Sequence, residues 1–138
     1  VETSPFYPAW VESAKKDIQD IKAAIAAKDF IRLGEITEAN GMKMHGTMLG
    51  AEPPFSYWEP DSIVAIKTAQ TLRKQGIPCY VTMDAGPNVK VLCRLSQAET
   101  IKQALLEHFT EDKLIITKPG KGIRELTAAE RAVYNWND

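Results

Sequence analysis

Hydrophobic residues in the first third of the chain recur every three or four positions, the spacing that places side chains on one face of an α-helix. A first helix is predicted from Pro8 onward, and its apolar face comprises Val11, Ala14, Ile18, Ile21 and Ile25. A second helix is predicted to begin after Asp29, a residue type that caps helix starts well, and to fade near residues 46–50. Its apolar positions include Phe30, Leu33, Met42, Met44 and Met48.

The stretch AEPPFSYWEPDS, residues 51–62, contains three prolines and three aromatic rings and predicts an ordered loop whose rings pack onto the protein. We expect Asp61 or Ser62 to cap a third helix, which should stop at Gly76. The apolar face of this helix is formed by Ile63, Ile66, Ala69 and Leu72.

After Gly76 the pattern becomes typical of β-strands. Strands are predicted at 79–83 and 89–95, joined by the turn DAGPN as a hairpin. Ser96 and Glu99 have the spacing of a capping box, which predicts a fourth helix with Ala98, Ile101, Leu105 and Phe109 on its apolar face. A last strand is predicted at 113–117, and residues 126–138 form a helix-capable tail. Helices segregated over a small antiparallel sheet define an α+β fold.

Composition and charge narrow the function classes. The 138 residues suit one domain, and 17 Lys plus Arg against 18 Asp plus Glu give a net charge of -1. We therefore expect no nucleic-acid partner and no membrane partner, and a cytoplasmic location. The two cysteines, Cys79 and Cys93, are expected as reduced thiols, and the two histidines and two cysteines match no zinc spacing, so no metal site is expected. Without an initiator methionine, the chain is expected to be processed or fragmentary.

Asp84, in the sequence YVTMDAGPNVK, admits two interpretations. In the first, Asp84 only stabilises the turn by accepting hydrogen bonds from the amides of Ala85 or Gly86, while Pro87 and Asn88 keep the connection tight. In the second, a rigid turn holds the carboxylate at the end of a strand, where it could accept a proton from a substrate hydroxyl. The local sequence alone favours the first interpretation.

Three separated segments change that balance. The turn TMDAGPNVK, the opening SPFYPAWV and the segment HGTMLGAEPPFSYWEPDS occur in an order that closely resembles the C-terminal half of mevalonate diphosphate decarboxylases, the bacterial form most nearly. This family belongs to the small-molecule kinase superfamily named for galactokinase, homoserine kinase, mevalonate kinase and phosphomevalonate kinase. The resemblance runs from about residue 3 to about residue 118 and implies ferredoxin-like helices packed on a small antiparallel sheet.

The resemblance also implies a reaction. In it, ATP phosphorylates the tertiary hydroxyl of mevalonate 5-diphosphate, and loss of phosphate and carbon dioxide then gives isopentenyl diphosphate. Asp84 matches the catalytic carboxylate beside the 3-hydroxyl, and the backbone of Ala85 and Gly86 is expected against the substrate. His45 and Met42 are weaker candidates for lining the cleft. For His45 the alternative is a hydrogen-bonded residue near the end of the second helix, and for Met42 it is core packing.

The family's phosphate-binding loop and the side chains that bind its two diphosphates lie upstream of the matched segments. ATP and Mg²⁺ are therefore expected to bind mainly through an N-terminal half, which would be this chain's partner. The sequence KPGKG, residues 118–122, lacks the context of a phosphate-binding loop and is interpreted as an exposed loop. Residues 1–125 are assigned to the C-terminal domain and 126–138 to a tail, and a homodimer is compatible with the resemblance.

Two other hypotheses remain open. A related kinase of the same superfamily would phosphorylate without decarboxylating, although Asp84 in place of a glycine-rich turn argues against it. A stand-alone ligand-binding α+β module is the other, since one fold serves many functions. RNA binding would require aromatic strand positions and a basic face, which the predicted strands lack.

Overall fold

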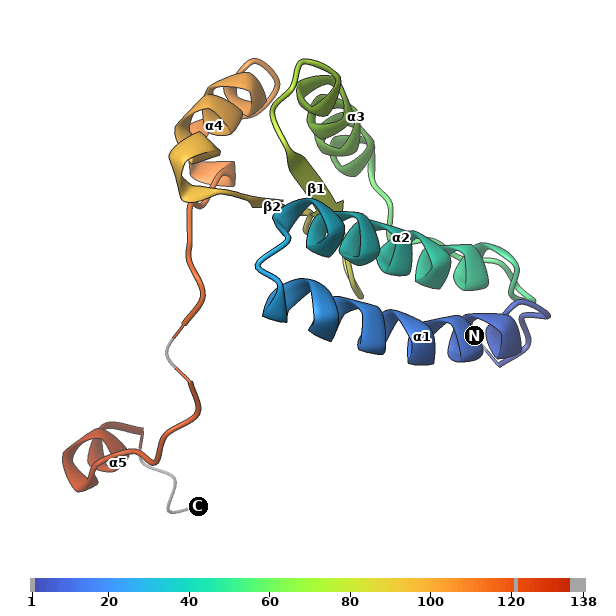
Figure 1. Cartoon of the computed structure of the whole chain (residues 1–138), viewed down its shortest axis with the longest axis horizontal. Helices are drawn as coiled ribbons and strands as arrows, with labels where there is room; N and C mark the ends of the chain where they lie inside the picture. The colour runs from blue at the N-terminus through green and yellow to red at the C-terminus, as the bar shows by residue number, and fades with distance from the viewer. Residues whose placement is uncertain (1, 121, 135–138) are drawn as a thin grey trace.

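A hairpin of two long helices forms the N-terminal part of the chain. In the computed structural model, which describes residues 2–120 and 122–134, α1 spans Tyr7–Ala26 and α2 spans Phe30–Leu49. The two helices lie side by side and run in opposite directions (Figure 1). Asp29 caps α2 as predicted, because its carboxylate accepts the backbone N–H of Arg32 at 3.0 Å. Helix α2 ends at Leu49, within the predicted range of 46–50.

The third helix, α3, spans Pro60–Lys74, and its start differs from the prediction. Glu59 occupies the N-cap position and Pro60 the first helical turn, where a proline needs no N–H partner. Ser62 therefore lies inside the helix, and its hydroxyl accepts the N–H of Glu59 at 3.3 Å. The predicted end is confirmed, since Gly76 follows the helix with a φ of +87°, a conformation that suits glycine.

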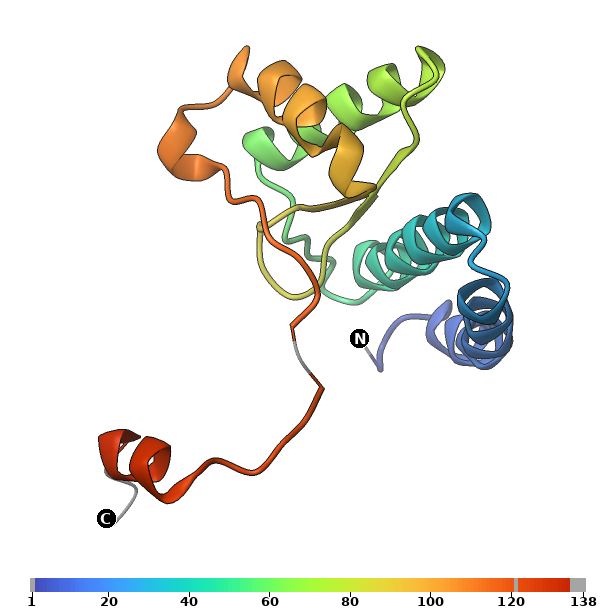
Figure 2. The same ribbon diagram turned by 60° about the vertical axis from the view of Figure 1, so that its left-hand side comes forward.

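The sheet is an antiparallel pair, β1 (Cys79–Thr82) with β2 (Lys90–Cys93), in which Val81 lies opposite Val91. Both strands are shorter than predicted. Helix α2 packs against β1 on one side, and α3 and α4 (Ala98–Leu106) lie together on the other (Figure 2). The core consists of Ala65, Ile66, Ala69, Leu72, Cys79, Val81, Ile101 and Leu105.

A single 3₁₀ turn, η1 (Leu95–Gln97), stands where a capping box was predicted at Ser96, and Gln97 is the N-cap of α4 without a side-chain cap. That prediction was wrong, because the chain leaving β2 turns tightly before the α-helix begins. Helix α4 also ends at Leu106, and Phe109 packs against the core from beyond the helix.

The predicted strand at 113–117 was wrong. A 3₁₀ turn, η2, covers Glu111–Lys113, and residues 114–120 have no regular structure. The apolar run suggested a strand, but a strand requires a neighbouring strand, and the described sheet pairs only β1 with β2. Ile115 is accordingly 87% exposed.

The last helix, α5 (Ala128–Tyr134), stands away from the other helices at the end of an extended segment (Figures 1 and 2). It falls within the helix-capable tail predicted at 126–138, of which residues 135–138 lie outside the described residues. Within the described chain, every helix is too short or too polar to cross a membrane.

One close approach fixes α2 against the sheet. A Cβ atom added to Gly34 would lie 2.0 Å from the ring of Tyr80, so the two elements meet where α2 carries no side chain. Tyr80 is in turn packed edge-on against Phe30, with ring centroids 6.1 Å apart. The five helices and the small antiparallel sheet of the described residues confirm the predicted α+β class.

Candidate functional site

The turn after β1 presents a charged side chain to solvent. The side chain of Asp84 is 74% exposed, and its Oδ1 accepts a hydrogen bond from Lys90 Nζ at 2.8 Å. That hydrogen bond and the charge of Lys90 hold the pKa of Asp84 below its ordinary value of 3.8. Asp84 is therefore an ionised carboxylate at neutral pH, with one cation beside it.

The turn is attached to the protein on both sides of Asp84. His45, on α2, lies 3.1 Å through its Nε2 from the carbonyl oxygen of Met83. Ser62, on α3, donates its hydroxyl to the carbonyl oxygen of Pro87 at 3.0 Å. Both side chains are buried, with 3% and 2% exposure. Two buried donors from different helices thus reach the two ends of the turn.

The residues predicted for the site are partly brought together. Asp84, Ala85 and Gly86 lie on one turn, and His45 reaches the carbonyl just before them. Gly86 has a φ of +120°, and a Cβ at that position would meet nothing within 4 Å, so the backbone there faces open space. Met42 instead packs against the hydrophobic core. Whether any of these residues contacts a substrate stays a prediction.

Sequence reasoning missed two residues of this arrangement. Lys90 is paired with Thr82 across the hairpin, and Asp84 lies two residues beyond Thr82, so the alternation of a hairpin could have placed lysine and carboxylate on one face. Ser62 was considered only as a helix cap. Its bond to Pro87 joins segments 25 residues apart, and no local pattern encodes such a contact.

A second carboxylate lies beside the middle of β1. Glu38, on α2, receives two hydrogen bonds from the guanidinium of Arg73, at 2.8 and 2.9 Å, and one from the backbone N–H of Val81, at 2.9 Å. Arg73 also donates to the carbonyl of Cys79 at 2.8 Å and lies over the ring of Tyr80 at 4.8 Å. Burial raises the pKa of Glu38, but the bonds from Arg73 and Val81 outweigh it, so the pKa falls below 4.5.

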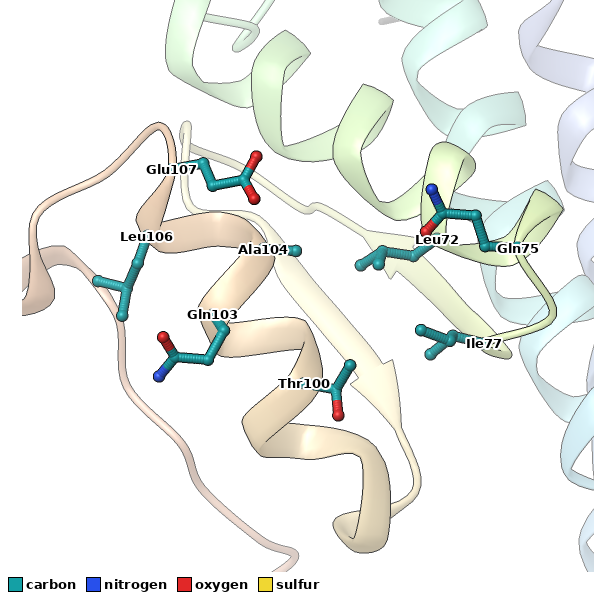
Figure 3. Close-up of a pocket in the computed structure, with 8 residues that line it drawn as sticks. All are labelled: Leu72, Gln75, Ile77, Thr100, Gln103, Ala104, Leu106 and Glu107. Atoms are coloured by element: carbon teal, nitrogen blue, oxygen red, sulfur yellow. The ribbon is translucent and has the colours of Figure 1, made fainter.

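A hollow of the described surface lies elsewhere. It has a volume of about 580 Å³ and opens between α3 and α4, where Leu72 and Ile77 face Ala104 and Thr100 (Figure 3). Ile77 precedes β1 whereas Asp84 follows it, so the hollow lies at the opposite end of the strand. Glu107 is the one ionisable residue that lines it, and this leaves the hollow without the groups that acid–base chemistry requires.

A smaller hollow of about 210 Å³ lies between α1 and α2 and reaches Thr82. Its polar side is an interhelical ion pair, in which Lys43 Nζ and Asp17 Oδ2 are 2.5 Å apart and Asn40 donates to the same oxygen at 2.9 Å. These contacts satisfy one another. They join the two helices.

The described residues offer no cluster of side chains suited to a metal ion. Among them, no group of three or more His, Cys, Asp or Glu side chains comes close enough to hold a metal ion. Asp84 is the exposed carboxylate of the turn, and its neighbour is a cation, which opposes metal binding. The donor set around Asp84 therefore does not fit a resident metal.

Comparison with known proteins supplies the context for this turn. Residues 1–134 match the family described as the Mevalonate 5-diphosphate decarboxylase C-terminal domain. The solved mevalonate diphosphate decarboxylase from Enterococcus faecalis is 54% identical with a TM-score of 0.80, and the match covers 83% of this chain and 36% of that chain. The curated diphosphomevalonate decarboxylase of Candida albicans is 29% identical over 98 residues, which is 71% of this chain and 27% of the relative.

A further solved structure, also 54% identical and with a TM-score of 0.80, is MDDEF in complex with MVAPP, AMPPCP and magnesium; the match covers 83% of this chain and 35% of that chain. The chain thus spans about a third of the length of these solved relatives. With nearly all of its residues matched, the chain belongs to the family of mevalonate 5-diphosphate decarboxylase C-terminal domains.

Proposed function

We propose that this chain is the part of an ATP-dependent diphosphomevalonate decarboxylase that supplies the catalytic carboxylate, Asp84. The observation that carries the proposal is the exposed, ionised carboxylate on a turn attached at both ends to buried side chains. It has no role in the core, unlike Glu38, and its one side-chain partner is an exposed lysine. A group placed in this way is free to meet a substrate.

In this proposal Asp84 lies beside the 3-hydroxyl of mevalonate 5-diphosphate and accepts its proton as the oxygen is phosphorylated. A tertiary alcohol is a weak nucleophile, so an aligned acceptor lowers the barrier together with the positioning of the reactants. Departure of phosphate and carbon dioxide then gives isopentenyl diphosphate. Asp84 is ionised at neutral pH, and Lys90 lowers its pKa further, so the carboxylate is in the form that accepts a proton.

The backbone of Ala85 and Gly86 is proposed to lie against the substrate. The positive φ of Gly86 and the open space at its Cβ position let the chain approach a ligand more closely than another residue would allow. His45 is only 3% exposed, so we propose that it acts beneath the turn and not at the substrate surface.

ATP and Mg²⁺ are proposed to bind mainly through the N-terminal part of the enzyme, because among the described residues no cluster of side chains could hold a metal ion. The structure reported with MVAPP, AMPPCP and magnesium is of a chain about three times the matched length, which supports this division. We also propose residues 1–125 as the C-terminal domain and 126–138 as its tail. A homodimer of the complete enzyme is compatible with this arrangement.

The test is Asp84→Asn in the full-length enzyme that contains this chain, assayed for carbon dioxide release from mevalonate 5-diphosphate with ATP. We expect turnover to fall by about 10²- to 10⁴-fold, the range for loss of a general base, with unfolding unchanged. Turnover within about threefold of wild type would reject Asp84 as the catalytic carboxylate. Substrate phosphorylation without carbon dioxide release in the wild type would instead identify a kinase of the superfamily.

A further inference from the structure

The turn that carries Asp84 is not closed by its own backbone. Among the described residues, no backbone–backbone hydrogen bond joins positions within 84–88. The first interpretation of Asp84, as an acceptor for the amides of Ala85 or Gly86, also finds no such hydrogen bond there, since the carboxylate is bonded to Lys90 instead. The β1–β2 pairing brings the ends of the turn together at Thr82 and Lys90, and between them the backbone depends on contacts with the rest of the protein.

Two contacts meet that need, and both use carbonyl groups. The carbonyl of Met83 is the last backbone acceptor before Asp84, and His45 Nε2 lies 3.1 Å from it. The carbonyl of Pro87 is the first acceptor after Gly86 to be bonded, and Ser62 Oγ donates to it at 3.0 Å. The three residues expected at the substrate, 84–86, are thus the ones between the two anchors.

His45 can act only as the donor in its contact, because a carbonyl oxygen accepts. This assigns the proton to Nε2. The ring is fixed from the other side by Trp58, whose ring centroid lies 5.4 Å away at a tilt of 56°. The other ring nitrogen, Nδ1, is buried without a hydrogen-bond partner in the described part of the chain. The histidine therefore makes one polar contact, and that contact is to the turn.

The hydroxyl of Ser62 is also used in hydrogen bonds. Ser62 is 2% exposed, its single proton goes to Pro87, and its oxygen accepts from Glu59. Because Met83 is itself buried, with 4% exposure, the anchor on that side is part of the packed interior. Helices α2 and α3 thus each contribute one buried donor that defines where the turn begins and ends.

We propose that His45 and Ser62 are positioning residues for Asp84, which fix the two carbonyls that flank the 84–86 segment. This inference rests on the proposed function of Asp84. His45 was a candidate for lining the substrate cleft on sequence grounds, and here it holds the turn from beneath. A carboxylate displaced by about 1 Å loses on the order of 10²-fold in rate, so such anchors matter to turnover.

The experiment compares His45→Phe with Thr47→Val in the full-length enzyme. Phenylalanine keeps a ring but cannot donate to Met83. Thr47 is a matched control, since it is 1% exposed on the same helix and its hydroxyl bonds only within α2, to Met44 at 2.6 Å. For His45→Phe we expect kcat to fall about 10- to 100-fold with KM changed by less than about threefold. Thr47→Val should keep kcat, and His45→Gln, which restores a donor, should recover most of it.

A second measurement separates this inference from the proposed function. Selective ¹⁵N labelling of alanine and glycine gives the backbone order parameters of Ala85 and Gly86, which do not depend on any reaction. We expect values near about 0.85 in the wild type and in Thr47→Val, and below about 0.6 in His45→Phe. If the wild type lacks decarboxylase activity, the proposed function fails, while the order parameters still decide whether His45 holds the turn.

Two results overturn the inference: order parameters of Ala85 and Gly86 that His45→Phe leaves unchanged, or order that is lost while kcat stays at the level of Thr47→Val. If His45→Phe does not fold, Ser62→Ala provides the same comparison from the other anchor. Its matched control is Thr68→Val, whose hydroxyl bonds within α3 to Val64 at 3.0 Å. If Ser62→Ala and Thr68→Val have the same kcat and the same order parameters at Ala85 and Gly86, the proposal is contradicted.

Discussion

Two carboxylates lie beside β1, each paired with one cation, and their surroundings differ. Glu38 is 17% exposed and accepts three hydrogen bonds, two from Arg73 and one from Val81. Asp84 is 74% exposed and accepts one side-chain hydrogen bond, from Lys90. The first joins α2, α3 and β1, and the second projects from the turn after β1.

The difference shows why an ion pair alone does not identify a site. Both carboxylates have a lowered pKa, so both are ionised at neutral pH. The acceptor capacity of Glu38 is used by the protein itself, whereas most of the oxygen surface of Asp84 stays in solvent. A carboxylate whose oxygens already accept hydrogen bonds from the protein, such as Glu38, stabilises the fold. An exposed carboxylate on an anchored turn, such as Asp84, is available for a ligand.

Replacing each carboxylate by its amide should give the largest difference between them, with turnover affected at Asp84 and stability affected at Glu38. Beside the large loss of turnover expected for Asp84→Asn, Glu38→Gln should lower the free energy of unfolding by about 2 kcal/mol, because the amide –NH₂ would face the donors of Arg73 or Val81. Urea unfolding and turnover per folded molecule, measured on both variants, check this. A Glu38→Gln protein as stable as wild type would show that the Arg73 bonds add nothing net.

The pH dependence of stability should sharpen the contrast. Because folding lowers the pKa of Glu38 below 4.5, its stabilisation is complete above about pH 4.5 and is lost as the pH falls through the folded-state pKa. The stability difference between wild type and Glu38→Gln should therefore narrow from about pH 5 to about pH 3. Urea midpoints at several pH values test this, and a difference that stays constant over that range contradicts the assignment.

The smallest effect is expected at Lys90. Lys90→Met removes the cation that lowers the pKa of Asp84, so that pKa should rise toward 3.8 and the acid limb of kcat/KM should move to higher pH. Added salt should move the wild-type limb in the same direction, since the pair is exposed and screened. Matching profiles for Lys90→Met and wild type would show that another group sets the charge of Asp84.

The elements with local signals were predictable from the sequence, and those that depend on tertiary contacts were not. Asp29 caps α2 and Gly76 follows α3 as the local chemistry dictates. The run around Ile115 has the composition of a strand, yet a strand also needs a partner, which composition does not encode. The Ser96 capping box failed because a 3₁₀ turn intervened.

The same division holds for the candidate site. Asp84 stood out because it lies in a turn that resembles a known family, and the hairpin that presents it follows from alternation and turn residues. The anchors at Met83 and Pro87 come from residues 38 and 25 positions away along the chain. Contacts between residues so far apart in the sequence depend on how the helices pack, and no short motif predicts them.

The close approach of Gly34 to Tyr80 has a consequence for reading substitution data. A mutational scan scored by survival should tolerate only glycine at position 34, since even a methyl group would lie 2.0 Å from the aromatic ring. Position 84 should be just as strict, for a chemical reason. Intolerance to change would thus give the two positions the same score, and only a separate assay of abundance would tell the residue that leaves room for a ring from the one proposed to meet the substrate.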